Sequence, residues 1–446
     1  MNDKPHRFGL TTLTCVVVAS MIGSGVFTTS GYSLAALGSP VRVLIAWCIG
    51  GVIALCGAVA YGELARRLPI SGGEYLYLSR RLHPFAGFLA GWVSLTAGFS
   101  GAIAMAAITF EIFAVPDAVR PNWLPLKSVA VAVIVLFGIG HAFLVRLFAA
   151  VQNAVVGIKL VALVAFLVVA AIQIPTHAWS IEPLGNPPAI WSPASLIAMS
   201  SSVMWISLSY AGFNAAVYIA SEAKEASRLV PRALWLGTLL VTVLYLLLNL
   251  VFVTATPALE IAGEEKIAGI AAVAIGGQRL NLLISTAIAL GTLSSVAGMI
   301  MTGPRVFSRM ADDGVFPVLF RSGPKSISRT VLLQTSIAVG MVFITDLKGL
   351  LDYLSTTLAL SSAVTVATLL LPEKPVELLS SGKRLPAPFA TLCAAMFCVA
   401  TVLIAALMIW HDKRDIFGTT VTILVGTILW LLTSTSQSKS AHGTEK

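Results

Sequence analysis

Residues Ile22-Gly23-Ser24-Gly25-Val26-Phe27 place two glycines and a serine in the middle of an apolar stretch, residues 10–37, that is long enough to cross a bilayer. A second apolar stretch, residues 194–220, carries a similar step at Ser209-Tyr210-Ala211-Gly212-Phe213-Asn214. Such steps interrupt a helix, and broken helices at corresponding places in two halves of a chain are typical of transporters. Close packing of small residues between helices is the alternative for either motif alone.

The rest of the sequence places these two stretches in a set of twelve. Residues 10–37, 41–65, 85–115, 126–144, 148–174, 194–220, 233–255, 281–310, 331–344, 347–371, 389–410 and 416–433 are long and nearly uncharged. The second break lies in the sixth stretch, five places after the first break, which indicates that helices one to five repeat as helices six to ten. We therefore predict an all-α polytopic membrane protein of about 12 transmembrane helices.

The composition agrees with a membrane protein and excludes other classes. Only 11% of the 446 residues are charged and 57% are hydrophobic, whereas soluble domains carry about 25% charged residues. The net charge is +9, but no basic patch interleaved with aromatic residues occurs, so we expect no nucleic-acid partner. The six histidines are solitary and no H-E-x-x-H motif or phosphate-binding G-x-x-x-x-G-K-[ST] loop is present. The sequence therefore predicts no enzyme, no metal site and no cofactor.

The basic residues indicate how the chain crosses the membrane. If the amino terminus is cytoplasmic, 20 of the 29 lysines and arginines fall in the inside connections and tails and eight in the outside ones. Because positive residues are retained on the inside, both termini are expected in the cytoplasm. The absence of a glycosylation-rich loop or long tails favours a bacterial inner membrane. A monomer or a homodimer in the lipid bilayer is compatible with the sequence.

The sequence resembles a known family, the amino acid, polyamine and organocation (APC) transporters. The motifs that carry the resemblance are Gly23-Ser24-Gly25, Pro69-Ile70-Ser71-Gly72-Gly73-Glu74-Tyr75-Leu76-Tyr77, Tyr210-Ala211-Gly212-Phe213-Asn214 with Ser221-Glu222-Ala223-Lys224, Pro231-Arg232-Ala233, and the stretch from Arg305 to Pro317. The resemblance implies a 5+5 inverted repeat of the leucine-transporter type: residues 10–174 and 194–371, followed by two C-terminal helices in residues 389–433. Residues 1–9 and 434–446 would be cytoplasmic tails.

The resemblance also implies a substrate site between the two breaks. A half-helix that starts after a break presents unpaired N–H groups, which suit a carboxylate, and one that ends before a break presents carbonyl groups, which suit an ammonium. N–H groups around residues 22–25 and the Ser24 hydroxyl would bind the α-carboxylate of an amino acid, and carbonyl groups of Met21, Leu208 and Ala211 its amino group. The expected substrate-binding residues are Ser20, Met21, Ile22, Gly23, Ser24, Gly25, Leu208, Tyr210, Ala211, Gly212 and Asn214.

One position departs from the family pattern. Members often have Phe or Trp at the place of Leu208, where the ring acts as a gate above the substrate. Either the gate here is aliphatic, or Tyr210 or Trp205 has taken over this role. For Tyr210 and Asn214, packing between helices is an equally good explanation.

Lys159 is the only charge deep within a predicted span. Burial without a carboxylate partner disfavours the charged form of a lysine, which is what a proton carrier needs. Some APC members resemble this chain in placing a lysine of the fifth helix where its ammonium substitutes for a sodium ion. We expect Lys159 to brace the first break when charged, with Ser294 or Ser295 as hydrogen-bond partners. A permanently charged brace and a lysine that snorkels to the cytoplasmic face are the alternatives.

The sequence thus predicts a secondary active transporter of amino acids that works by alternating access, with the proton as coupling ion. An exchanger of amino acids or polyamines is the alternative within transport. A polyamine would favour an acidic pocket, and the neutral Asn214 stands where some amine-recognising members are acidic. A sensor that binds amino acids without moving them is the alternative outside transport.

Overall fold

The computed structural model describes residues 8–115, 120–143, 145–323, 326–372, 388–411 and 416–443. Within these ranges nearly all secondary structure is helical, and the one β-type contact is an isolated bridge between Phe8 and Ala223. The helices of the first half are α1 (Leu10–Met21), α2 (Gly25–Leu37), α3 (Pro40–Arg67), α4 (Gly73–Arg81), α5 (Pro84–Val93), the π-helix η1 (Ser94–Gly101), α6 (Ala102–Ala114), α7 (Ser128–Phe143) and α8 (Val145–Gln173).

The second half is helical as well. Its helices are α9 (Pro193–Ser209), the 3-10 helix η3 (Ala215–Glu222), α10 (Ala226–Thr254), α11 (Ala258–Ile261), α12 (Ile267–Asp312), the 3-10 helix η4 (Val318–Phe320), α13 (Ser326–Ile344), α14 (Leu347–Ala367) and the 3-10 helix η5 (Thr368–Leu370). Two more helices, α15 (Pro388–His411) and α16 (Phe417–Gly443), complete the chain.

These helices confirm the predicted fold class of a polytopic all-α membrane protein. Within the described residues, seven helices are long and apolar enough to cross a bilayer, and α1 with α2 forms an eighth span that is bent by 44°. Four shorter apolar helices lie in α7, α8, α9 and α16. Together they match the twelve predicted stretches one by one.

Some boundaries differ from the sequence prediction. Helix α12 begins at Ile267, before the predicted span 281–310, because a short helix joins it across a kink at Gly277. Helix α16 continues to Gly443, ten residues into the stretch 434–446 that was predicted to be a tail. Of the predicted amino-terminal tail 1–9, only Phe8 and Gly9 lie within the described residues.

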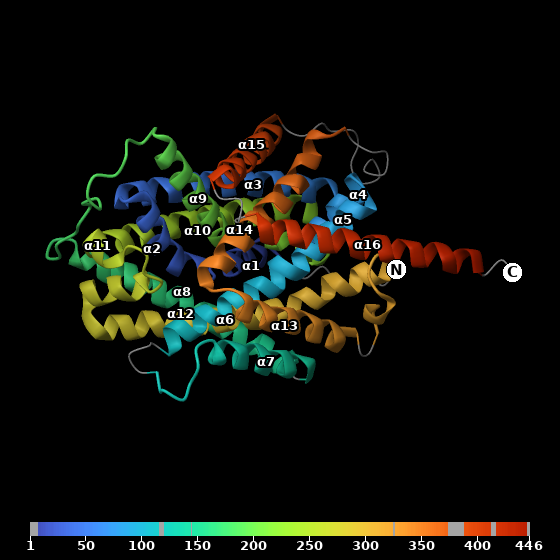
Figure 1. Cartoon of the computed structure of the whole chain (residues 1–446), viewed down its shortest axis with the longest axis horizontal. Helices are drawn as coiled ribbons and strands as arrows, with labels where there is room; N and C mark the ends of the chain where they lie inside the picture. Colours follow the sequence, from blue (N-terminus) through green and yellow to red (C-terminus); the bar gives the residue numbers. More distant parts are fainter. Residues whose placement is uncertain are drawn as a thin grey trace.

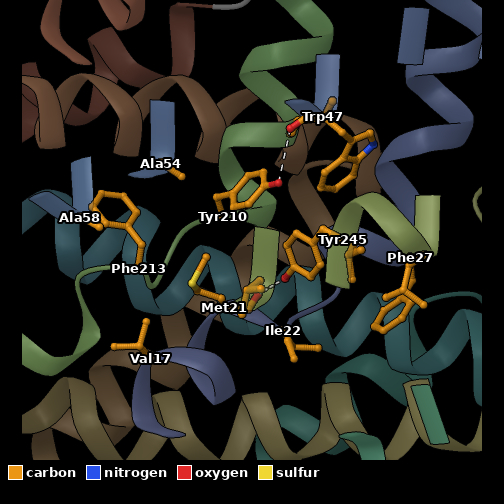
Figure 2. Close-up of a cluster of buried hydrophobic side chains, with 14 of the residues drawn as sticks. Val17, Met21, Ile22, Phe27, Trp47, Ala54, Ala58, Tyr210, Phe213 and Tyr245 are labelled. Atoms are coloured by element: carbon orange, nitrogen blue, oxygen red, sulfur yellow. Dashed lines mark hydrogen bonds between the residues drawn. The ribbon is translucent and has the colours of Figure 1, made fainter. Parts of the chain in front are cut away.

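The helices run side by side in one bundle, with α1 in its middle and α7 and α15 at opposite margins (Figure 1). Helix α3 packs along α10, and α6 and α8 pack along α12. The main buried cluster surrounds the first break and includes Val17, Met21, Trp47, Tyr210 and Tyr245 (Figure 2). The two interrupted segments therefore lie in the interior, where irregular backbone is shielded from lipid.

Candidate functional site

The first break lies between α1 and α2. Helix α1 ends at Met21, Ile22 leaves the helical region with ψ of 81°, and α2 begins at Gly25. The Gly23 N–H donates to the Met21 carbonyl at 2.8 Å, which closes a tight turn. The first N–H groups of α2 have no partner within their own helix and point into the break. An anion placed there would meet the positive end of the helix dipole.

The second break follows the end of α9 at Ser209. Gly212 has φ of +100°, a conformation that L side chains rarely adopt, and a Cβ there would lie 2.8 Å from the Ser20 carbonyl oxygen. On the other side of the contact, a Cβ at Gly25 would lie 2.5 Å from the Ser209 Oγ. Glycine at both positions thus lets the two broken segments touch each other. The paired-break interpretation of the sequence agrees with this geometry.

Tyr245 of α10 joins the two breaks, and sequence reasoning missed it. Its hydroxyl donates to the Met21 carbonyl oxygen at 2.6 Å (Figure 2). The same hydroxyl lies 3.1 Å from the Ser209 carbonyl oxygen. The ring packs against Trp47 and Tyr210, with centroids 5.5 and 5.2 Å away. The only signal in the sequence is a single tyrosine in an otherwise aliphatic stretch of α10. The Met21 carbonyl, which was expected to face a substrate amino group, therefore already accepts two hydrogen bonds in this conformation.

A cavity of about 750 Å³ lies between the breaks. Ten of the eleven expected substrate-binding residues line it, together with Lys159, Ser294 and Ser295. The exception is Ile22, whose side chain is buried outside the cavity. Tyr210 belongs to the wall, but its ring is buried and its hydroxyl donates to the Trp47 carbonyl at 3.4 Å. These positions place the residues together, and their role as substrate ligands stays a prediction.

The cavity opens toward one face of the molecule. Its wall continues from the breaks to Ser71 and Glu74 beside α4, to Glu222 at the end of η3 and to Arg305 and Arg309 near the end of α12. Glu222, Arg305 and Arg309 are exposed to solvent. This is the face to which the sequence assigns most arginines and lysines.

The other side of the breaks is closed by polar contacts. Trp205 lies five residues before Tyr210 in α9, about 7.5 Å further along the helix axis. Its Nε1–H donates to the Asp352 carboxylate of α14 at 2.5 Å, and the Lys348 ammonium lies 5.4 Å above its ring. Next to it, the Tyr32 hydroxyl donates to Glu265 at 2.6 Å, which ties α2 to the segment before α12. We refer to Tyr32, Trp205, Glu265, Lys348 and Asp352 as the outer latch.

The outer latch contains Trp205, one of the residues that could act as the gate in place of the aromatic ring missing at Leu208. Leu208 lines the cavity without an aromatic ring, while Trp205 stands between the cavity and the closed side. Of the residues named as gate candidates, Trp205 contacts Asp352 and Lys348 on this side of the breaks, and its role as a gate stays a prediction. Tyr210 is held within the packed core instead.

Lys159 reaches the first break from α8. The side chain is 2% exposed, and its Nζ donates to the Ile22 carbonyl at 2.5 Å. The Ser295 hydroxyl, an expected partner, donates to the Gly291 carbonyl at 3.0 Å instead, and Ser294 lines the same cavity. The alternative that Lys159 snorkels to the membrane surface is wrong, because its nitrogen is enclosed at the break. The geometry is that of a brace on the first helix.

Glu74 is a second functional candidate that the sequence did not single out. It is a buried carboxylate of α4 in the cavity wall, and it accepts hydrogen bonds from the hydroxyls of Tyr61 at 2.5 Å and of Ser361 and Ser362 at 2.9 Å. These donors come from α3 and α14. Glu74 therefore anchors the short helix α4 to the bundle beside the mouth of the cavity.

Tyr75 holds α4 in place through a second contact. Its hydroxyl donates to Asp313 at 2.8 Å. Burial and this carboxylate raise the pKa of the Tyr75 hydroxyl, which therefore remains a donor throughout the physiological range. Elsewhere in the described part of the chain, no three His, Cys, Asp or Glu side chains gather in a way that would hold a metal ion.

A bundle of about twelve apolar helices, with two broken helices that face one cavity open to one side, defines a multi-pass membrane transporter for a small solute. The chain belongs to the amino acid permease family, whose family model matches residues 8–435. This membership confirms the resemblance drawn from the motifs, and it supports the prediction that the chain is a transporter.

Similar proteins include amino acid transporters of mammals. The human Asc-type amino acid transporter 1 is 27% identical over 321 residues, which cover 70% of this chain and 60% of that protein. The human large neutral amino acids transporter small subunit 2 is 29% identical over 374 residues, 81% of this chain and 68% of the relative. The mouse b(0,+)-type amino acid transporter 1 is 27% identical over 363 residues, 78% and 72% of the two chains.

Proposed function

We propose that the protein is a secondary active transporter of neutral amino acids that works by alternating access. The observation that carries the proposal is the cavity between the two breaks, which is open toward one face and closed toward the other by the outer latch. A transporter of this kind exposes its site to one side at a time. The names of the relatives support amino acids as the solute.

The residues at the breaks suit the charged groups that all amino acids share. The N–H groups at the start of α2 and the Ser24 hydroxyl would hold the carboxylate, as the helix dipole favours an anion there. The carbonyls of Leu208 and Ala211 lie at the end of α9 and would face the amino group. The charged residues Glu74, Glu222, Arg305 and Arg309 line the cavity toward its mouth, and the Lys159 ammonium beside the first break is bound to the Ile22 carbonyl. A neutral substrate side chain therefore fits best between the breaks.

The proton is our proposed coupling ion, with Lys159 as its carrier. Charged, Lys159 holds the Ile22 carbonyl at the first break, and loss of the proton would weaken that contact and release α1. Exchange of internal for external amino acid, with Lys159 as a permanent brace, is the second candidate. We further propose that both termini are cytoplasmic, that the membrane is a bacterial inner membrane, and that the cavity opens to the cytoplasm.

The test is uptake of labelled amino acids into liposomes that contain the purified protein. Uptake would be measured with and without an inward proton gradient, for the unaltered chain and for Lys159→Ala, with Lys127→Ala, a lysine of the loop before α7, as control. We expect the gradient to stimulate uptake by the unaltered chain and the control, and Lys159→Ala to lose this response. Uptake that needs internal amino acid and ignores pH would identify an exchanger, and binding without uptake would identify a sensor.

A further inference from the structure

Among the described residues, five charged side chains line the cavity between the breaks, and three of them already have polar partners. The Lys159 ammonium donates to the Ile22 carbonyl. The Glu74 carboxylate accepts hydrogen bonds from three hydroxyl groups. Arg309 forms an ion pair with Asp313, with 3.2 Å between nitrogen and oxygen. Two charges of opposite sign are left.

These two charges are Glu222 and Arg305. Both residues are exposed, and in the part of the chain that the structure describes neither side chain makes a hydrogen bond or an ion pair. The one polar contact of Glu222 uses its backbone carbonyl, which accepts from the Phe8 N–H at 3.1 Å. In the open conformation, water therefore solvates both the carboxylate and the guanidinium group.

The two residues belong to two borders of the same mouth. Glu222 is the last residue of η3, and Arg305 lies in the last third of α12. The neighbouring Ser221 hydroxyl lies 2.6 Å from that of Ser71, just before α4. At the other border, Tyr75 of α4 donates to the carboxylate that follows α12. Helix α4 and the residues that lead into it thus touch both borders.

Both charges stand beside interruptions of regular helical structure. Arg305 directly follows Pro304, which lacks the N–H that would bond the Ile300 carbonyl in a regular helix. Ile219, three residues before Glu222, departs from helical geometry with φ of −121° and ψ of 18°. The backbone can bend at these two points without breaking helical hydrogen bonds. The borders that carry the charges can therefore approach each other.

We propose that Glu222 and Arg305 form an ion pair that locks the mouth of the cavity when it closes. This inference rests on the proposed alternating access, in which the site is exposed to one side at a time. Closure removes water from between the two side chains, and opposite charges attract each other more strongly where water is excluded. A guanidinium group can give a carboxylate two parallel hydrogen bonds, which would also fix how the two borders meet.

The first test exchanges the two charges. Glu222→Arg and Arg305→Glu each place like charges at the closed mouth, so we expect each to reduce amino acid uptake in proteoliposomes about tenfold, the effect of losing one hydrogen bond between charged groups. The double variant Glu222→Arg, Arg305→Glu restores opposite charges and should recover most of the uptake. The matched control is the same exchange at Glu225 and Arg228, an exposed ion pair outside the cavity wall, which should leave uptake unchanged.

The second test needs no transport. The double variant Glu222→Cys, Arg305→Cys, in the full-length chain without the five native cysteines, would be treated with copper phenanthroline, which oxidises two neighbouring thiols to a disulfide. We expect mass spectrometry to find the disulfide, because closure brings the two positions together. The control pair Glu225→Cys, Arg305→Cys should form it several-fold more slowly, since Glu225 lies outside the wall.

Absence of the disulfide between positions 222 and 305, or a charge exchange that fails to restore uptake, would overturn the proposal. Single reversals that raise the KM for the amino acid and leave the maximal rate unchanged would also overturn it, because the two charges would then attract the substrate and not lock the mouth. Failure of uptake in the unaltered chain would count against the proposed transport function alone, since the disulfide is measured without transport.

Discussion

At the scale of single residues, side chains hold backbone groups in place at the proposed substrate site. Tyr245 contacts the carbonyls at the ends of α1 and α9, and Lys159 contacts the carbonyl of Ile22. Carbonyl groups at a broken helix lack the partners that a continuous helix would supply. Each of these side chains replaces part of the missing hydrogen bonding.

Tyr245→Phe tests this role directly. The substitution keeps the packed ring and removes the hydroxyl, so the tie between the two breaks should weaken by ~1 kcal/mol, the usual net value of a buried hydrogen bond. We expect a several-fold lower rate of amino acid uptake in proteoliposomes, with unchanged yield of folded protein. Tyr353→Phe is the control, because that hydroxyl bonds Thr422 between α14 and α16 and lies outside the cavity. Equal effects of the two variants would refute a special role of Tyr245.

Gly212 provides a test of the second break at the same scale. Gly212→Ala would place a Cβ 2.8 Å from the Ser20 carbonyl oxygen at a backbone φ of +100°. Strain of this kind costs ~1–3 kcal/mol, so substrate affinity and thermal stability should both fall. Gly340→Ala in α13 is the control, since no atom lies within 4 Å of a Cβ there. The check is binding by isothermal titration calorimetry together with a melting curve, and a Gly212→Ala variant that binds normally would show that the break tolerates a side chain.

At the scale of elements, the helices close the cavity on one side and leave it open on the other. The outer latch joins α2, α9 and α14, while α4 borders the open mouth of the cavity through Glu74. Helix α4 is held by hydroxyl donors from α3 and α14, and by Tyr75 at its other face. Both groups of contacts are formed in this conformation. If the protein works by alternating access, the outer latch must break when the open mouth beside α4 closes.

The outer latch predicts a shift in accessibility when Trp205 is altered. Trp205→Phe removes the N–H that donates to Asp352 and leaves an aromatic ring, so the closed side should open more often. The measurement is labelling of Ser20→Cys, in a background without the five native cysteines, by an impermeant maleimide applied from the closed face. We expect labelling to rise several-fold, and to stay unchanged in Trp123→Phe, which alters an exposed tryptophan. If Trp205 acts through Asp352, the double variant Trp205→Phe, Asp352→Asn should be labelled no more than the stronger single variant. Labelling that equals the sum of the two single effects would argue against a direct contact.

At the scale of the whole molecule, family membership and the cavity together support the proposal that the solute is an amino acid. The chain belongs to the amino acid permease family, and its two broken helices meet around one cavity. The amino acids share a carboxylate and an amino group and differ in their side chains. A site built from helix ends binds the shared part and leaves the side chain to the remaining wall.

If the site binds the carboxylate and amino group that all amino acids share, it should select the compounds that compete for uptake by those two groups. Neutral amino acids should inhibit uptake of a labelled neutral amino acid, whereas the corresponding amine without the carboxylate should be at least about tenfold weaker, because a charge-assisted hydrogen bond contributes ~1.5–3 kcal/mol. The amino acid with an acetylated amino group should be weak as well. The check is a competition series in proteoliposomes. Strong inhibition by the free amine would favour the polyamine exchanger.

The sequence by itself determined the spans, the two breaks and the family, because these depend on local properties. Apolar length decides whether a helix crosses a bilayer, and glycine decides where a helix can stop in its middle. The same local signal located Lys159 and ten of the residues that line the cavity.

Only the tertiary structure decided which distant groups meet. Tyr245 lies 224 residues from Met21 in the chain, Trp205 lies 147 residues from Asp352, and Ser362 lies 288 residues from Glu74. Nothing in the local pattern of α10 or α14 distinguishes these positions from other polar residues in apolar helices. Their partners are set by how the helices pack, and packing depends on the shapes of all side chains in the interface at once.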